Sequence, residues 1–261
     1  MRLMLLAFVI TLGSAHAAVL DDSAGRVVPQ AQSAAGESAV PQIINGLVTD
    51  AYPAVARLDI WTANSSATGE IILCTGTLVR PTTILTAAHC VADDAPVAIN
   101  AVFQTPTAQT YAVIGYQFHP EYRFPVADVA VLWLEAPVVG ITPLPLAGWN
   151  PRPRTFGTIV GYGLDEVGNL GVKEMGSVRL KRCPRRALPA LGLWRGDLAR
   201  DLCWSRRPWQ QDTCHGDSGG PLLIGGAVAG VTSGGDANCT GSLSWDTSVA
   251  PFLPWITSLL L

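Results

Sequence analysis

The sequence is poor in charged residues, and the two signs nearly cancel. Only 14% of its 261 residues are Asp, Glu, Lys or Arg, and the formal net charge is −3. A nearly neutral balance gives no reason to expect nucleic acid as the main partner. Glycine and proline are frequent instead, with 26 and 19 residues. This composition predicts many turns and short strands rather than long helices.

Hydrophobic runs long enough to anchor the chain in a membrane are also lacking. The apolar run Leu3–Leu12 is too short to span a bilayer, so we expect no membrane association. Arg2 precedes this run and Ala15-His16-Ala17 follows it, a pattern typical of a secretory signal peptide over residues 1–17. We therefore expect a secreted protein, extracellular or periplasmic.

Cysteine is scarce but even in number. Export favours three disulfides, and the residues alone leave the pairing open. A zinc site using Cys90 or Cys214 with the adjacent histidine lacks metal-ligand spacing, so we discount it. No acidic calcium loop is visible over residues 95–120, and we expect neither a metal nor a cofactor. The six cysteines are Cys74, Cys90, Cys183, Cys203, Cys214 and Cys239.

The organisation of the chain follows from where β-rich runs begin and end. Residues 18–42 are rich in Ala, Ser, Gln and Pro, which indicates a pro-segment or linker. Beyond them, short β-rich runs alternate with turn residues, the spacing of an all-β barrel or sandwich. A proline-rich connector separates an N-terminal half, about 43–145, from a C-terminal half, about 146–261. The tail at 249–261 predicts a short helix.

A basic cluster flanks the stretch between Cys183 and Cys203. It could bind a partner, but a solvated surface loop closed by a disulfide is the favoured interpretation. The members of the cluster are Lys181, Arg182, Arg206 and Arg207.

The stretch "DTCHGDSGGPLL", Asp212–Leu223, places Ser218 among glycines in a G-x-S-x-G pattern. A serine nucleophile needs a base within hydrogen-bond reach. An α/β-hydrolase carries its histidine after the serine, whereas every histidine here precedes Ser218, which excludes a lipase or esterase of that type. The histidines are His16, His89, His119 and His215.

Three blocks stand in the order His, Asp, Ser of the chymotrypsin type: "TAAHC" (86–90), "DVAVLWL" (128–134) and "CHGDSGGPL" (214–222). They resemble the signature blocks of trypsin-like serine proteases, and the resemblance covers about residues 43–261. It implies an all-β fold of two antiparallel six-stranded β-barrels packed together, with a short C-terminal helix.

The resemblance also implies a role for each matching residue. His89 would be the general base and then acid, Asp128 would orient it, and Ser218 would attack the scissile carbonyl. The N–H groups of Gly216 and Ser218 would bind the oxyanion. His119 is expected to be structural or exposed. His215 has no catalytic role here, although it could line the substrate site.

The two aspartates near Ser218 receive separate roles from the resemblance. Asp217 matches the residue that pairs with a newly formed N-terminal amine, which Ile43 would supply after cleavage of the Gln42–Ile43 bond. The protein would then be a zymogen with pro-segment 18–42. Because Gln42 is not basic, another protease would have to cut this bond. Asp212 matches the base of a pocket that selects Arg or Lys.

Further residues near the pocket also match the family or depart from it. Gly235 resembles a pocket-wall glycine, and Ser233 a serine that supports the catalytic aspartate. Ser244 stands where a second wall glycine is usual, and Gly234 replaces a usual tryptophan. The Cys74–Cys90 and Cys214–Cys239 bridges fit the family, and neighbour pairing leaves Cys183–Cys203 as the third.

The expected partners are protein or peptide substrates, an activating protease and protein inhibitors of a monomeric enzyme. The alternative is a catalytically silent homologue that acts as a binding module. The complete set of His89, Asp128, Ser218 and Gly216 favours the enzyme.

Overall fold

The computed structural model describes most of the chain from Ile43 onward. The expected signal peptide and pro-segment, residues 1–17 and 18–42, lie outside the described residues, as do Arg206 and Arg207 of the basic cluster. The described residues are 43–65, 69–93, 95–104, 107–164, 170–185, 193–194, 196–205, 209–236, 238–239 and 241–260.

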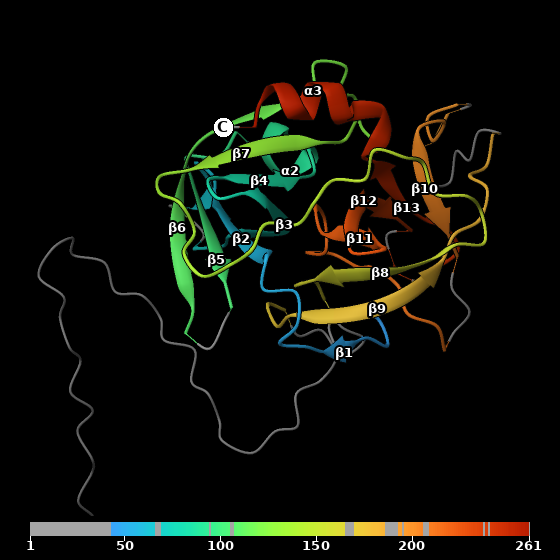
Figure 1. Cartoon of the computed structure of the whole chain (residues 1–261), viewed down its shortest axis with the longest axis horizontal. Helices are drawn as coiled ribbons and strands as arrows, with labels where there is room; N and C mark the ends of the chain where they lie inside the picture. The colour runs from blue at the N-terminus through green and yellow to red at the C-terminus, as the bar shows by residue number, and fades with distance from the viewer. Residues whose placement is uncertain are drawn as a thin grey trace, which may run out of the picture. The chain divides into compact units, whose positions relative to one another are not determined.

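Six antiparallel strands close into a barrel in the order β2-β3-β4-β7-β6-β5 (Figure 1). β-branched and aliphatic residues dominate these strands, which suits a half-buried pleated surface. Leu58, Leu78, Ile84 and Leu132 are fully buried in its core. The strands are β2 (Val55–Trp61), β3 (Ile72–Arg80), β4 (Thr83–Thr86), β5 (Ala98–Phe103), β6 (Gln109–Phe118) and β7 (Ala130–Leu134).

The second half forms a seven-stranded antiparallel sheet in the order β1-β9-β8-β11-β12-β13-β10. A single β-bridge between Lys181, just after β9, and Cys203 on β10 brings the ends of six of these strands together. Pro184 follows soon after and cannot donate to a longer ladder. The strands are β1 (Leu47–Val48), β8 (Phe156–Gly161), β9 (Glu174–Arg179), β10 (Asp201–Trp204), β11 (Pro221–Ile224), β12 (Ala227–Gly235) and β13 (Ser244–Ser248).

The all-β expectation is therefore confirmed, with one difference in detail. The first barrel is closed by ladders throughout, whereas the second is joined by one bridge and carries the short strand β1 on its edge at β9.

Helices are short and few among the described residues. The expected C-terminal helix is confirmed as α3 (Leu253–Ser258), which follows the 3-10 turn η2 (Ala250–Phe252). Phe252 and Ile256 are buried in the main core. The other described helix is α2 (His89–Ala92). No helix in the described part of the chain has the length and apolar character needed to cross a membrane.

Disulfides join the six cysteines in the three expected pairs, Cys74–Cys90, Cys183–Cys203 and Cys214–Cys239. The sulfurs of Cys90 and Cys214 are therefore not thiolates, the form that would bind zinc.

Contacts between the two sheets place the Ser218 loop against the first barrel. The backbone N–H of Thr75 on β3 donates to the carbonyl of Ser218 over 2.8 Å. The hydroxyl of Tyr162, just after β8, donates to the carbonyl of Val55 on β2 over 3.1 Å. The side chain of Tyr162 is fully buried. The sheets thus fix the loop that holds Ser218 relative to the strand and helix that hold His89.

Candidate active site

The carboxylate of Asp128 holds the imidazole of His89. His89 opens α2, and Asp128 lies two residues before β7. Nδ1 of His89 is 2.7 Å from Oδ2 of Asp128, and the backbone N–H of His89 donates to Oδ1 over 2.9 Å. The hydroxyl of Ser233 on β12 donates to the same Oδ2 over 2.6 Å. These bonds fix a fully buried carboxylate and leave Nε2 as the ring nitrogen available for proton exchange.

The surroundings make His89 a stronger base. Burial alone would lower the pKa of its imidazole. The negative charge of Asp128 and its hydrogen bond outweigh this, with help from Asp93, and the pKa rises above the ordinary value of 6.5. The ring also meets Phe124 edge to face, with centroids 5.8 Å apart. The imidazole is therefore oriented on both sides and tuned toward accepting a proton.

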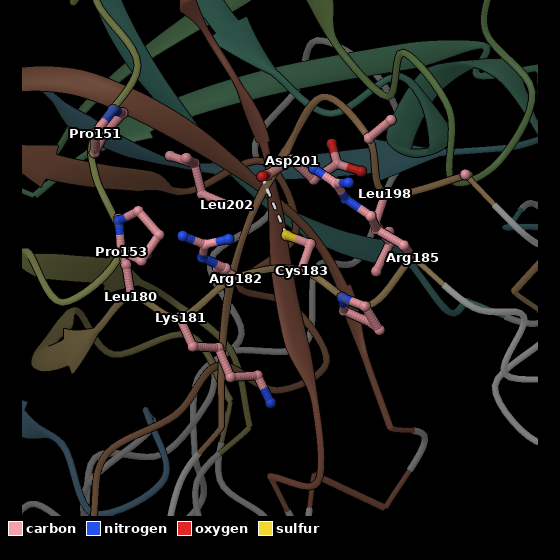
Figure 2. A pocket seen from close by; sticks show the side chains of 13 residues that line it. Pro151, Pro153, Leu180, Lys181, Arg182, Cys183, Arg185, Leu198, Asp201 and Leu202 are labelled. Atoms are coloured by element: carbon pink, nitrogen blue, oxygen red, sulfur yellow. Dashed lines mark hydrogen bonds between the residues drawn. The ribbon is translucent and has the colours of Figure 1, made fainter.

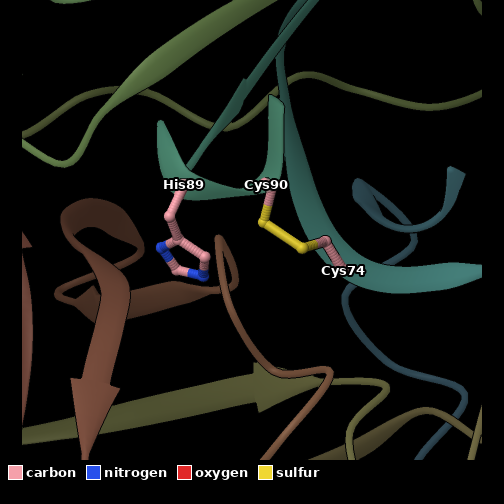
Figure 3. A group of neighbouring side chains, drawn as sticks. All are labelled: Cys74, His89 and Cys90. Atoms are coloured by element: carbon pink, nitrogen blue, oxygen red, sulfur yellow. A yellow bond between two sulfur atoms is a disulfide. The ribbon is translucent and has the colours of Figure 1, made fainter. Parts of the chain in front are cut away.

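The disulfide Cys74–Cys90 braces the strand and helix that carry the imidazole (Figure 3). It ties β3 to the first turn of α2, directly beside His89. The three side chains lie close enough to suggest a metal cluster by geometry alone. Because the two sulfurs are bonded to each other, this group is a structural brace next to the candidate base.

Gly216 gives the loop before Ser218 its shape. Its φ of 95° lies in the left-handed region that favours glycine. A Cβ atom at this position would also lie 2.9 Å from the Cα of Gly163. The N–H groups of Gly216 and Ser218 find no hydrogen-bond acceptor among the described residues, unlike those of Asp217 and Gly219. Two backbone donors are thus available next to the serine hydroxyl.

His89 and Ser218 line the same cavity, which has a volume of about 400 Å³. The other lining residues are Asp93, Phe124, Thr213, Cys214, His215, Thr232, Ser233, Gly234, Gly235, Cys239 and Trp245. His215 therefore lines the site, as considered from the sequence. His119 contacts the rings of Phe252 and Trp255 instead, away from this cavity.

The expected pocket residues divide into two groups. Ser233 and Gly235 line the cavity, but Asp212 and Ser244 do not, and both are almost completely buried. Oδ1 of Asp212 accepts the indole N–H of Trp204 over 2.7 Å and the backbone N–H of Thr213 over 2.9 Å. The carboxylate of Asp212 thus lies behind the cavity wall that Thr213 forms.

Buried carboxylates gather behind this wall. Burial raises the pKa of Asp217 to about 8, and the charges of Glu174 and Asp212 add to the increase. Burial also raises the pKa of Asp246 well above its ordinary value, and Asp201, Asp212 and Asp217 contribute. A cation in the adjoining pocket would favour ionisation of these carboxyls and would be attracted by the negative charge that results.

No hydrogen bond joins the expected activation residues Ile43 and Asp217 in the part of the chain that the structure describes. The carboxylate of Asp217 accepts the N–H groups of Gly163 and Cys214 over 2.8 and 2.9 Å. The backbone N–H of Ile43 donates to Oε2 of Glu174 on β9 over 2.6 Å. Glu174 was not selected from the sequence, because a lone glutamate in "VKEMG" carries no sign of its partner.

A second, larger cavity of about 950 Å³ lies beside the Cys183–Cys203 bridge (Figure 2). This cavity is lined by Lys181 and Arg182 of the expected basic cluster, by the nearby Arg185 and by several prolines. The sulfur of Cys183 lies 3.1 Å from the carbonyl oxygen of Asp201. Because it contains none of the candidate catalytic groups, it is not the candidate active site.

Comparison with known proteins agrees with this geometry. The trypsin family model matches residues 49–256. A trypsin of Saccharopolyspora erythraea is 31% identical over 175 residues, covering 62% of this chain and 75% of the relative. Human cathepsin G is 30% identical over 198 residues, covering 72% of this chain and 76% of the relative.

Solved structures with 22% sequence identity share the fold. The one described as "Structure of GrC" has a TM-score of 0.68 and is matched over 83% of this chain and 98% of its own. A structure of HL collagenase has the same TM-score and coverage of 83% and 97%. Together with the family match over most of the chain, these comparisons establish that the protein belongs to the trypsin-like, chymotrypsin-fold serine protease family.

Proposed function

We propose that the protein is a secreted serine endopeptidase that uses His89, Asp128 and Ser218 as a catalytic triad. The observation that carries the proposal is the 2.7 Å contact between Nδ1 of His89 and Oδ2 of Asp128, in a cavity that Ser218 also lines. With Nδ1 held by Asp128, Nε2 of His89 is the nitrogen left to act as a base toward Ser218.

The reaction would follow from these positions. Nε2 of His89 takes the proton of the Ser218 hydroxyl as Oγ attacks the scissile carbonyl. The N–H groups of Gly216 and Ser218 stabilise the oxyanion that forms. His89 then gives its proton to the departing amine, which leaves an acyl-enzyme. Water, deprotonated by the same imidazole, releases the acid product.

The proposed specificity is a preference for Arg or Lys at the cleaved position. The charge of Asp212 raises the pKa of both Asp217 and Asp246, so a substrate cation near Asp212 would offset this repulsion. Asp212 stands directly before Thr213, a residue of the cavity wall. We propose that the negative charge of Asp212 attracts a cationic substrate side chain across this wall.

We also propose that the protein is made as a zymogen and exported. A signal peptide over 1–17 and a pro-segment over 18–42 would precede the protease domain. An activating protease would cut the Gln42–Ile43 bond. The buried position of Ile43 supports this proposal, because its backbone nitrogen already faces a buried carboxylate.

A fluorophosphonate probe, which labels an activated serine, tests the triad. The processed protein should be labelled and the Ser218→Ala variant should not, whereas Ser258→Ala, an exposed serine on α3, should label like the wild type. Peptides ending in Arg, Lys, Phe or Ala then define specificity. Absence of labelling in processed protein would favour the alternative, a catalytically silent binding module.

A further inference from the structure

The turn that starts at Ile43 closes around one carboxylate. The backbone N–H of Ile43 donates to Oε2 of Glu174 over 2.6 Å, and both residues are fully buried. A Cβ atom on Gly46 would lie 2.5 Å from the same Oε2. Only glycine therefore lets the turn approach the carboxylate this closely.

Strand β9 presents Glu174 beside an apolar socket for Ile43. Glu174 and Gly176 are two residues apart on this strand, so they share a face. A Cβ atom on Gly176 would lie 3.1 Å from Cγ2 of Ile43, so glycine leaves room for that side chain. Ile43 packs with Ile159 and Val178 in the core of the second sheet. The isoleucine side chain thus fixes its own nitrogen against Glu174.

Two charged side chains lie near this site, Asp217 and Lys173. Glu174 is close enough to Asp217 for its charge to raise the pKa of the Asp217 carboxyl. Lys173 precedes Glu174 in sequence, but its Nζ faces the carbonyl oxygens of Tyr52 and Gln104, each 3.4 Å away. An α-ammonium at the position of the Ile43 nitrogen would lie in direct contact with this buried carboxylate and form a buried ion pair with it.

We propose that Glu174 is a second carboxylate of the activation switch and directly holds the α-ammonium that cleavage would create at Ile43. This inference rests on the zymogen proposed above and adds a residue to it. Hydrolysis adds one water across the Gln42–Ile43 bond, leaving a carboxylate on Gln42 and a protonated amine on Ile43. The N–H that now faces Glu174 becomes one of three ammonium donors.

Thermal unfolding before and after cleavage tests this role. An enteropeptidase recognition sequence in place of residues 38–42 makes Ile43 the first residue of the product, which N-terminal sequencing verifies. The Ser218→Ala background prevents self-digestion. Cleavage should raise the Tm of this reference chain by about 5 °C, since a buried ion pair forms.

The Glu174→Gln variant should lose most of this gain. Its uncleaved Tm should stay near the reference, because the glutamine oxygen can still accept the Ile43 N–H. A merely structural role would instead lower both forms equally. Glu135→Gln, at an exposed site, should keep the full gain. With Ser218 present, cleaved Glu174→Gln should be on the order of 100-fold less active than the cleaved wild type.

The pH dependence gives an independent readout. The group in contact with the new ammonium is Glu174, and the charges of Glu174 and Asp212 both act on the nearby Asp217. Pairing raises the pKa of the ammonium above its unfolded value of about 8, so the Tm gain is complete below that pH. The gain is lost as pH rises through the folded pKa, and that loss should occur at lower pH in Glu174→Gln.

The outcomes separate this inference from the proposed function. An undiminished gain in Glu174→Gln, with loss only in Asp217→Asn, would show that Asp217 alone holds the ammonium and overturn the inference. A gain that depends on Glu174 in a protein without peptidase activity would support the inference while the catalytic proposal fails. If cleavage changes neither the Tm of the Ser218→Ala reference chain nor the activity of the chain with Ser218, the switch and the role of Glu174 are both wrong.

Discussion

The indole ring of Trp245 lies directly over the backbone of Gly234. The two residues are paired in the register of β12 and β13. A Cβ atom on Gly234 would come within 2.6 Å of Cζ2 of Trp245. Both residues line the cavity that contains Ser218. In the trypsin-like pattern the tryptophan stands at the position of Gly234, so here the neighbouring strand supplies the aromatic surface.

This relationship predicts that the two positions are coupled. Gly234→Trp alone should destabilise the protein by about 3 kcal/mol, because the new ring meets the existing one. Trp245→Val alone should cost about 3 kcal/mol through the cavity it leaves. The double variant should recover part of both losses. Urea unfolding in the Ser218→Ala background measures this cycle, and simple additivity would contradict the coupling.

The contact between His89 and Asp128 predicts a change in the pH profile. Asp128→Asn removes the charge that raises the pKa of His89 and leaves burial, which lowers it. The acid limb of kcat/KM, where His89 becomes protonated and inactive, should therefore move to lower pH. kcat should also fall by about 10⁴-fold as the tautomer is lost.

Asp93→Asn is the matched control for this change. Asp93 also raises the pKa of His89, but by charge alone, since its carboxylate accepts the hydroxyl of Tyr122. The acid limb of kcat/KM in Asp93→Asn should also move to lower pH, but by a smaller amount than in Asp128→Asn. Its kcat should stay within about threefold of the wild type. A large loss of kcat in Asp93→Asn would contradict the separate roles of the two aspartates.

The position of Asp212 predicts a specific loss of basic preference. Asp212→Asn keeps an oxygen to accept the N–H groups of Trp204 and Thr213, so the fold should be retained. kcat/KM for peptides ending in Arg or Lys should fall on the order of 100-fold, because the substrate cation loses its partner. Peptides ending in Phe should change by about twofold or less. An equal loss on all peptides would assign Asp212 a structural role.

The sequence predicted the architecture because its signals are local. Alternating strands, turn residues and three motif blocks indicated an all-β fold, and the closed barrel of β2 to β7 follows that pattern. The single bridge from Lys181 to Cys203 could not be foreseen, since it depends on how the segment after β9 meets a strand some 20 residues later.

The residues of the candidate site could be predicted where the residue type itself indicates the chemistry. His89, Asp128 and Ser233 are brought together, as the family resemblance implied. Glu174 and Trp245 were missed, because their roles depend on cross-strand neighbours rather than on adjacent residues. The glycine at 234 was the one available signal for Trp245, since a missing side chain must be replaced by another in a packed site.

The raised pKa of Asp217 predicts how the uncleaved chain responds to pH. Its pKa is about 8 in the folded chain against 3.8 ordinarily, with burial as the main cause. Between these values the folded state holds a proton that the unfolded state has lost, so the free energy of unfolding decreases as pH rises from about 4 to about 8. Asp217→Asn should make this slope shallower, because Asp201 and Asp246 also have raised pKa values and keep their contributions, whereas Glu135→Gln should retain the full slope. Measuring the Tm across that pH range in the uncleaved Ser218→Ala chain tests this prediction. A slope unchanged by Asp217→Asn would show that Asp217 is ionised in the folded protein.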